Sequence, residues 1–172
     1  MLGLSQASAW GPGVGNLVPG ATPPMLSGAP SMNIRTLDST TIPRLATELA
    51  TDTATLVLNL SGADVGAQGT AILAPSLIQN TTLTTLGIDH NEVGAAGAQS
   101  LVPAIEKNNT MTALFLGRNK IGSGGTAVLA PAIEKNTKLL TLSLSGNSIG
   151  DSGAIALVPT IEKNSTLTSL DL

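Results

Sequence analysis

The amino-acid sequence predicts an α/β solenoid, a fold in which one strand-and-helix unit is copied along an axis. Two observations predict it. Apolar residues, asparagines and glycines recur in the same slots every 28 residues, and a fixed period of about 20–50 residues is typical of solenoids. Each unit also contains a short stretch in which apolar side chains alternate with small or polar ones, as in a strand with one buried face.

The repeats begin at residue 52, and the unit is clearest at Leu83-x-x-Leu86-x-Ile88-x-x-Asn91-x-Val93-Gly94. The same slots then hold Met111, Leu114, Leu116, Asn119, Ile121 and Gly122, and after them Leu139, Leu142, Leu144, Asn147, Ile149 and Gly150. The helical half of the unit recurs as well, and each complete copy from 80 onward closes on Glu-Lys-Asn. We therefore divide this region into repeats 52–79, 80–107, 108–135 and 136–163 and an incomplete copy, 164–172.

This pattern, LxxLxLxxNxIGxxGAxxLxxAIxxN, resembles the leucine-rich repeat of the ribonuclease-inhibitor type over residues 52–172. The resemblance implies a curved parallel β-sheet on the concave side of the solenoid and helices on the convex side. It also implies that Asn91, Asn119 and Asn147 form a ladder to the backbone of adjacent coils, in line with the rule that buried backbone groups are paired. Ala63 occupies that slot in the first repeat, so we expect the ladder to be missing there.

The helical half of each repeat carries an interior proline, at Pro75, Pro103, Pro131 and Pro159. An interior proline costs a continuous helix roughly 3 kcal/mol. We therefore expect short helices that kink at the proline and end at Asn80, Asn108, Asn136 and Asn164, because asparagine tolerates the left-handed conformation.

The first 38 residues are predicted to form an uncharged, Gly/Pro-rich arm, since no charged residue occurs from Met1 to Ile34. Two interpretations are open: a disordered leader, or an arm in which residues 1–34 dock on a partner. The second uses the apolar side chains of Trp10, Leu17, Val18, Met25 and Leu26. Residues 39–51 are predicted to be a helical N-terminal cap, because TIPRLATELA resembles the helical half of a repeat that lacks its strand.

The sequence stops at Leu170-Asp171-Leu172, in the strand of a repeat. A terminal repeat exposes a hydrophobic face unless something caps it. We expect either that a partner covers this strand or that the sequence is a fragment of a longer repeat array, and we favour the fragment.

Composition argues against most chemistry. The chain has no cysteine, one histidine (His90), a net charge of −3 and only Trp10 and Phe115 as aromatic residues. We therefore expect no cofactor, no metal and no nucleic-acid partner. Pairing His90 as a base with Asp89 is disfavoured because adjacent strand residues face opposite sides. No nucleotide-binding or hydrolase motif occurs, and no apolar run is long enough to span a membrane.

The concave face follows from the alternation, because Leu86 and Ile88 point into the core and their neighbours point away from it. This face is small and mostly uncharged, with Phe115 as its one large anchor. Its candidate partner-binding residues are Val57, Asn59, Thr85, Asp89, Phe115, Arg118, Thr141 and Ser143.

The leading hypothesis is a non-enzymatic protein-interaction or scaffold module, as a subunit or fragment of a larger assembly. The alternative is a regulator of an enzyme, because the resemblance extends to Ran GTPase-activating proteins and nuclease inhibitors. Such regulators need charged rim residues, and this chain offers only Asp89, Arg118 and Lys120. A third interpretation is a spacer whose concave face contacts nothing. The chain also contains N-x-[ST] sequons at Asn59, Asn80, Asn108 and Asn164, and three of them are by-products of the repeat.

Overall fold

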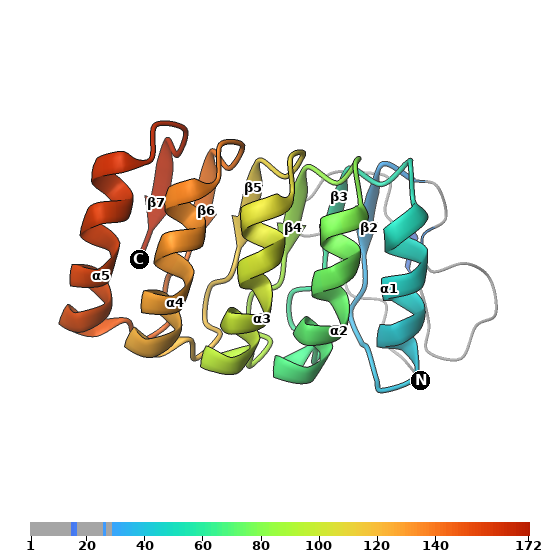
Figure 1. Cartoon of the computed structure of the whole chain (residues 1–172). Helices are drawn as coiled ribbons and strands as arrows, with labels where there is room; N and C mark the ends of the chain where they lie inside the picture. Colours follow the sequence, from blue (N-terminus) through green and yellow to red (C-terminus); the bar gives the residue numbers. More distant parts are fainter. Residues whose placement is uncertain (1–14, 17–25, 27–28) are drawn as a thin grey trace.

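The computed structural model describes residues 15–16, 26 and 29–172. Across this part of the chain, short strands alternate with helices. In Figure 1 the helices stand side by side in one layer, with the strands behind them in another. The strands are β1 (Gly15–Asn16), β2 (Ser31–Asn33), β3 (Val57–Asn59), β4 (Thr85–Gly87), β5 (Ala113–Phe115), β6 (Thr141–Ser143) and β7 (Ser169–Asp171). The helices are α1 (Thr41–Thr51), α2 (Gly66–Gln79), α3 (Gly94–Lys107), α4 (Gly122–Lys135) and α5 (Gly150–Lys163).

All the strands belong to one parallel sheet in which they follow chain order from β1 to β7. From β3 onward each strand pairs with the next in the register of the sequence period, so Leu58 lies beside Leu86 and Leu86 beside Leu114. This arrangement confirms the predicted α/β solenoid. Among the described residues, no helix is both long and apolar enough to cross a membrane.

The core lies between the sheet and the helix layer and is built from the repeated leucine slots. Leu114 and Leu116 of one coil are 0% exposed, and Leu101 and Ile105 on α3 are 1% exposed. Burying one such side chain contributes roughly 1.5–3 kcal/mol. The helices approach closely because glycine occupies the first turn: a Cβ at Gly125 would lie 3.1 Å from the Cα of Ala95 on the preceding helix.

Each of α2 to α5 runs 14 residues and continues through its proline, so the helices are longer than the short segments expected. The physical reason lies in which face the proline occupies. Pro75 and Pro103 are exposed, and so are Ala71 and Gln99, the residues whose carbonyls lose their helical partner. Water can solvate those carbonyls, so the lost hydrogen bond leaves no buried polar group.

The asparagines that close the helices act through their side chains rather than through a left-handed backbone. Asn108 has φ −69° and ψ 129°, which is extended. Its side-chain nitrogen donates to the carbonyl of Leu77 at 2.6 Å, and its side-chain oxygen accepts the N–H groups of Thr110 and Met111 at 2.9 and 2.7 Å. The same bonds recur at Asn80, Asn136 and Asn164. The expectation of a left-handed helix end is therefore wrong, and the sequons mark structural asparagines.

The segment before α1 also differs from expectation, because the 41–50 helix does have a strand. Strand β2 pairs with β3 in the register Met32 to Leu58, and Met32 and Ile34, at the end of the predicted arm, are 1% exposed. Of the arm residues singled out above, Leu26 is buried and its N–H donates to Glu48 Oε2 at 2.9 Å. The others, Trp10, Leu17, Val18 and Met25, lie outside the described residues. The division of the chain into arm, cap and repeats stays a prediction.

One core slot holds a polar residue in place of leucine, and this generates the first prediction. Thr55 occupies the position of Leu83 and is 0% exposed, and its hydroxyl has no hydrogen-bond partner among the described residues. We expect Thr55→Val to raise the free energy of unfolding in urea by about 1 kcal/mol, because it removes a buried unsatisfied hydroxyl. Thr70→Val is the control, since the Thr70 hydroxyl donates to the carbonyl of Gly66 at 2.7 Å. Equal stabilisation by both changes would contradict this account.

The asparagines at the helix ends generate a second prediction. Asn108→Ala leaves buried backbone donors and acceptors unpaired, so we expect a loss of about 2–4 kcal/mol in the free energy of unfolding. The adjacent Asn109 is exposed, and Asn109→Ala should change stability by less than about 0.5 kcal/mol. Urea unfolding of both variants tests this, and a similar loss in each would show that the side-chain bonds of Asn108 are unimportant.

The cap of α1 generates a third prediction. The Thr40 hydroxyl, followed by the N–H groups of Thr41 and Thr40 and the Thr41 hydroxyl, lowers the pKa of Asp38 from 3.8 to about 2. Because the folded pKa is the lower one, the stabilisation is complete above about pH 4 and is lost as the pH falls through about 2. We expect the difference in Tm between the wild-type protein and Asp38→Ala to shrink over that interval. A difference independent of pH would show that these bonds do not favour the carboxylate.

Candidate protein-binding surface

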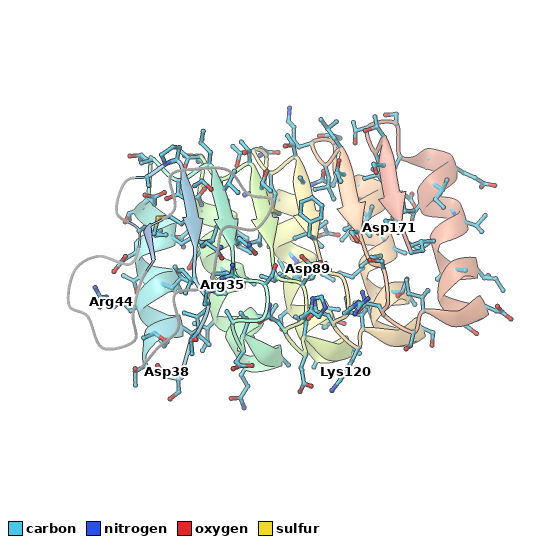
Figure 2. All side chains as sticks on the ribbon, turned by 180° about the vertical axis from the view of Figure 1, so that it is seen from behind. Arg35, Asp38, Arg44, Asp89, Lys120 and Asp171 are labelled. Carbon is cyan, nitrogen blue, oxygen red and sulfur yellow. The ribbon has the colours of Figure 1, made fainter. Side chains whose placement is uncertain are left out.

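The side of the sheet opposite the helices, called here the open face, presents the strand residues on either side of each buried leucine. Figure 2 shows this face, with Asp89 near its middle, Asp171 on the last strand, and Lys120 at the lower edge. Because side chains alternate along a strand, each strand places its first and third residue on this face. The first residues of β3 to β6 are all half-buried: Val57, Thr85, Ala113 and Thr141.

Phe115 is the largest side chain in the central part of this face. It is the third residue of β5 and lies in register between Gly87 on β4 and Ser143 on β6. The ring is half-buried, and its neighbours in the sheet are small and uncharged. Such a ring is suited to a partner, because an aromatic side chain contributes a large contact area from few rotatable bonds.

Asp89 follows β4 and is held across three coils. Its Oδ1 accepts the N–H of Gly117 at 2.7 Å, and its Oδ2 accepts the hydroxyl of Ser61 at 3.3 Å. A Cβ at residue 117 would lie 2.8 Å from that Oδ1, so glycine at this position leaves room for the carboxylate in its hydrogen-bonded position. Asp89 is therefore a positioned, half-buried acceptor rather than a mobile surface charge.

His90 and Arg118 occupy equivalent slots in neighbouring coils, and both are exposed. Their backbones are left-handed, with φ 57° and 54°, whereas the flanking coils hold Gly62 and Gly146 in this slot. Gly146 makes room for Arg118, since a Cβ there would lie 2.9 Å from the arginine Cγ and 3.8 Å from its Nε. Within the described part of the chain, neither side chain has an ion pair.

The sequence-predicted residues fall into groups in the structure. Thr141 and Ser143 lie on the open face beside Phe115, and Val57 and Thr85 lie on its N-terminal half. Asn59 is only 4% exposed, and its side-chain oxygen accepts the N–H and hydroxyl of Ser61. It offers no surface to a partner and drops out of the candidate set, because its carboxamide is committed to the turn after β3.

The asparagines after the strands are buried under this face. Asn119 donates to the carbonyl of Ile88 at 2.8 Å and accepts the N–H of Asn91 at 2.8 Å. Asn91 and Asn147 bond in the same way to Leu60 and Leu116. The side chain of Ala63 can make no such bond. A second row, Asn80 to Asn164, closes the helices. Its position recurs every 28 residues in the sequence, but the pattern alone did not reveal its side-chain hydrogen bonds to the preceding coil.

No chemical centre accompanies this surface in the described residues. They contain no group of three or more His, Asp or Glu side chains that could hold a metal. Asp89 is engaged by neutral donors, and His90 stands on the exposed rim. The arrangement can offer an aromatic contact, hydroxyl groups and the guanidinium of Arg118 to a binding partner.

A family model described as Leucine Rich repeat matches residues 79–102, 107–130 and 135–158. No curated protein matches the sequence. Among solved structures, the chain is similar to one titled Leiomodin-1 Actin-Binding Site 2 (ABS2), with a TM-score of 0.70 and 18% identity over 78% of this chain and 79% of that one.

A second similar structure is the tropomodulin C-terminal domain from Caenorhabditis elegans, with a TM-score of 0.61 and 14% identity over 74% of this chain and 77% of that one. Identities this low describe a shared fold. The assignment to the ribonuclease-inhibitor type of repeat stays a prediction.

Proposed function

This chain is a leucine-rich-repeat protein, and from that premise we propose that it is a non-enzymatic interaction module whose open face binds a protein partner. The single observation that carries the proposal is Phe115. A half-buried aromatic side chain stands at the middle of an otherwise small-residue sheet, between Gly87 and Ser143. Aromatic residues at the centre of a surface are favoured as binding hot spots.

The surroundings of Phe115 favour close approach by a partner. The first residues of β4, β5 and β6 are short: they are Thr85, Ala113 and Thr141. The two threonines carry hydroxyls that can form hydrogen bonds with a partner's backbone. Among the described residues of this part of the sheet, no long charged side chain has to move or lose its water first. A helix or an extended segment can therefore lie directly on the strands.

The frame behind the face is rigid, which supports a scaffold role. Each strand is fixed by parallel pairing, by the buried leucines and by the two rows of asparagines. Side chains held on such a frame lose little freedom on binding, so the contact area is converted more fully into affinity. We include in the proposal that the chain acts as a subunit of a larger assembly.

The test is a pull-down with the full chain and two variants that each shorten one apolar side chain. Phe115→Ala removes the anchor, and Ile155→Ala removes an apolar side chain on α5 that is 69% exposed. We expect a partner that the wild-type protein and Ile155→Ala both retain to be lost with Phe115→Ala, by about tenfold or more in affinity. Thermal unfolding of each variant checks that the fold is intact.

Retention of the same partner by folded Phe115→Ala would overturn the open face as the binding surface. Purified actin is one defined probe for the assay, because a structure of the same fold is titled as an actin-binding site. The enzyme-regulator alternative rests on Arg118, and acceleration of a GTPase that Arg118→Ala abolishes would favour it over a scaffold.

A further inference from the structure

We propose that the rim at the carboxyl end of the open face, formed by Asp89, His90 and Arg118, receives an acidic segment of the protein partner. In this arrangement a partner carboxylate is seated on the guanidinium of Arg118. The inference rests on the proposed function and adds the chemistry of the partner to it. It begins from His90 and Arg118, which stand next to each other in equivalent slots.

The backbone fixes His90 and Arg118 side by side. The N–H of His90 donates to the carbonyl of Gly117 at 2.9 Å, and the N–H of Arg118 donates to that of Ser145 at 2.7 Å. The two slots are therefore linked coil to coil, at the spacing of adjacent strands of about 4.8 Å. Both side chains leave the backbone at the same edge of the sheet.

The turn after each strand is left-handed at this slot, and glycine fills it in the flanking coils at positions 62 and 146. The same left-handed backbone recurs two residues later at Glu92 and Lys120, so the repeated turn sets it. The two central coils differ from their neighbours in carrying an imidazole and a guanidinium at this slot, where the flanking coils have no side chain.

Arg118 has no such partner, although charges lie nearby. Lys120 pairs with Glu92 on the preceding coil, so those two charges satisfy each other. Asp89 is engaged by Gly117 and Ser61 and makes no ion pair with Arg118. Within the described residues, the Arg118 side chain is exposed and has no ion pair, and it lies against Gly146 of the next coil.

An arginine presented in this way favours a carboxylate, because the planar guanidinium forms two parallel hydrogen bonds to the two oxygens. Phe115 lies on the same coil, three residues before Arg118. The partner segment that fits both therefore carries an apolar side chain for Phe115 and an acidic side chain near it. The positioned carboxylate of Asp89 disfavours a second acidic group on that side and so limits the register.

The experiment measures binding of a labelled peptide, in which glutamates flank a single leucine, to the full chain by fluorescence anisotropy. The matched peptide has glutamine in place of each glutamate. Arg118→Gly installs the residue found in the flanking coils, so it should fold at least as stably as the wild-type protein. Arg35→Gln is the control, because it removes one exposed cation from the N-terminal end of the chain's repeats.

We expect the glutamate peptide to bind at least about tenfold more tightly than the glutamine peptide, and Arg118→Gly to remove that difference. Arg35→Gln should leave it within about twofold. Equal affinity for the two peptides, no binding of the glutamate peptide up to about 1 mM, or an unchanged preference in Arg118→Gly would overturn the inference. Tighter binding of a phosphorylated peptide or of single-stranded RNA would overturn the assignment to a carboxylate.

Phe115→Ala separates this inference from the proposed function. If Phe115→Ala weakens both peptides about tenfold while Arg118→Gly has no effect, the open face binds protein and the acidic preference fails. If Phe115→Ala has no effect on either peptide or on the pull-down, the proposed function fails as well.

Discussion

The need to pair buried backbone groups at the corners of the coils governs this structure. Parallel strands as short as three residues leave carbonyl and N–H groups at each coil corner with no regular secondary structure to satisfy them. Two rows of asparagine side chains do so, one after the strands and one after the helices. Each asparagine both donates and accepts, so it joins its own turn to the coil before it. The 28-residue period, the register of the sheet and the packing of the leucines are consistent with one asparagine of each row in each of the coils 80–107, 108–135 and 136–163.

The sequence was sufficient for the solenoid because the apolar slots recur without insertion from Leu83 to Ile149. It was not sufficient for β2, because Ser31 pairs with Val57 at a separation that breaks the period, and the strand holds a single large apolar residue. The length of the helices was also not evident. The sequence places a proline inside each helix but does not show that the carbonyl which loses its partner faces water, as it does here.

Part of the candidate surface could likewise be predicted from the sequence, and part could not. Alternation along the strand places Phe115 and Thr141 on the open face, since that depends only on local geometry. It cannot reveal that Asn59 is buried, that Gly117 admits the carboxylate of Asp89, or that Gly146 lies under Arg118. Those facts depend on contacts between coils. The sequence alone does not show which glycine lies against a side chain of the neighbouring coil. The left-handed backbone of His90 and Arg118 is likewise a property of the folded turn.

The alanine at position 63 affects where unfolding of the solenoid begins. In a stacked array each coil is coupled only to its neighbours, so the free energy of the whole is a sum of local terms. At the corner after β3 the side chain of residue 63 adds no rung toward β2, and the backbone bond from Leu37 to the Ala63 carbonyl holds that corner. The boundary between the first two coils is then a weak link in a one-dimensional chain of couplings. The stack would open there as a block, with β2 and α1 parting from an intact remainder.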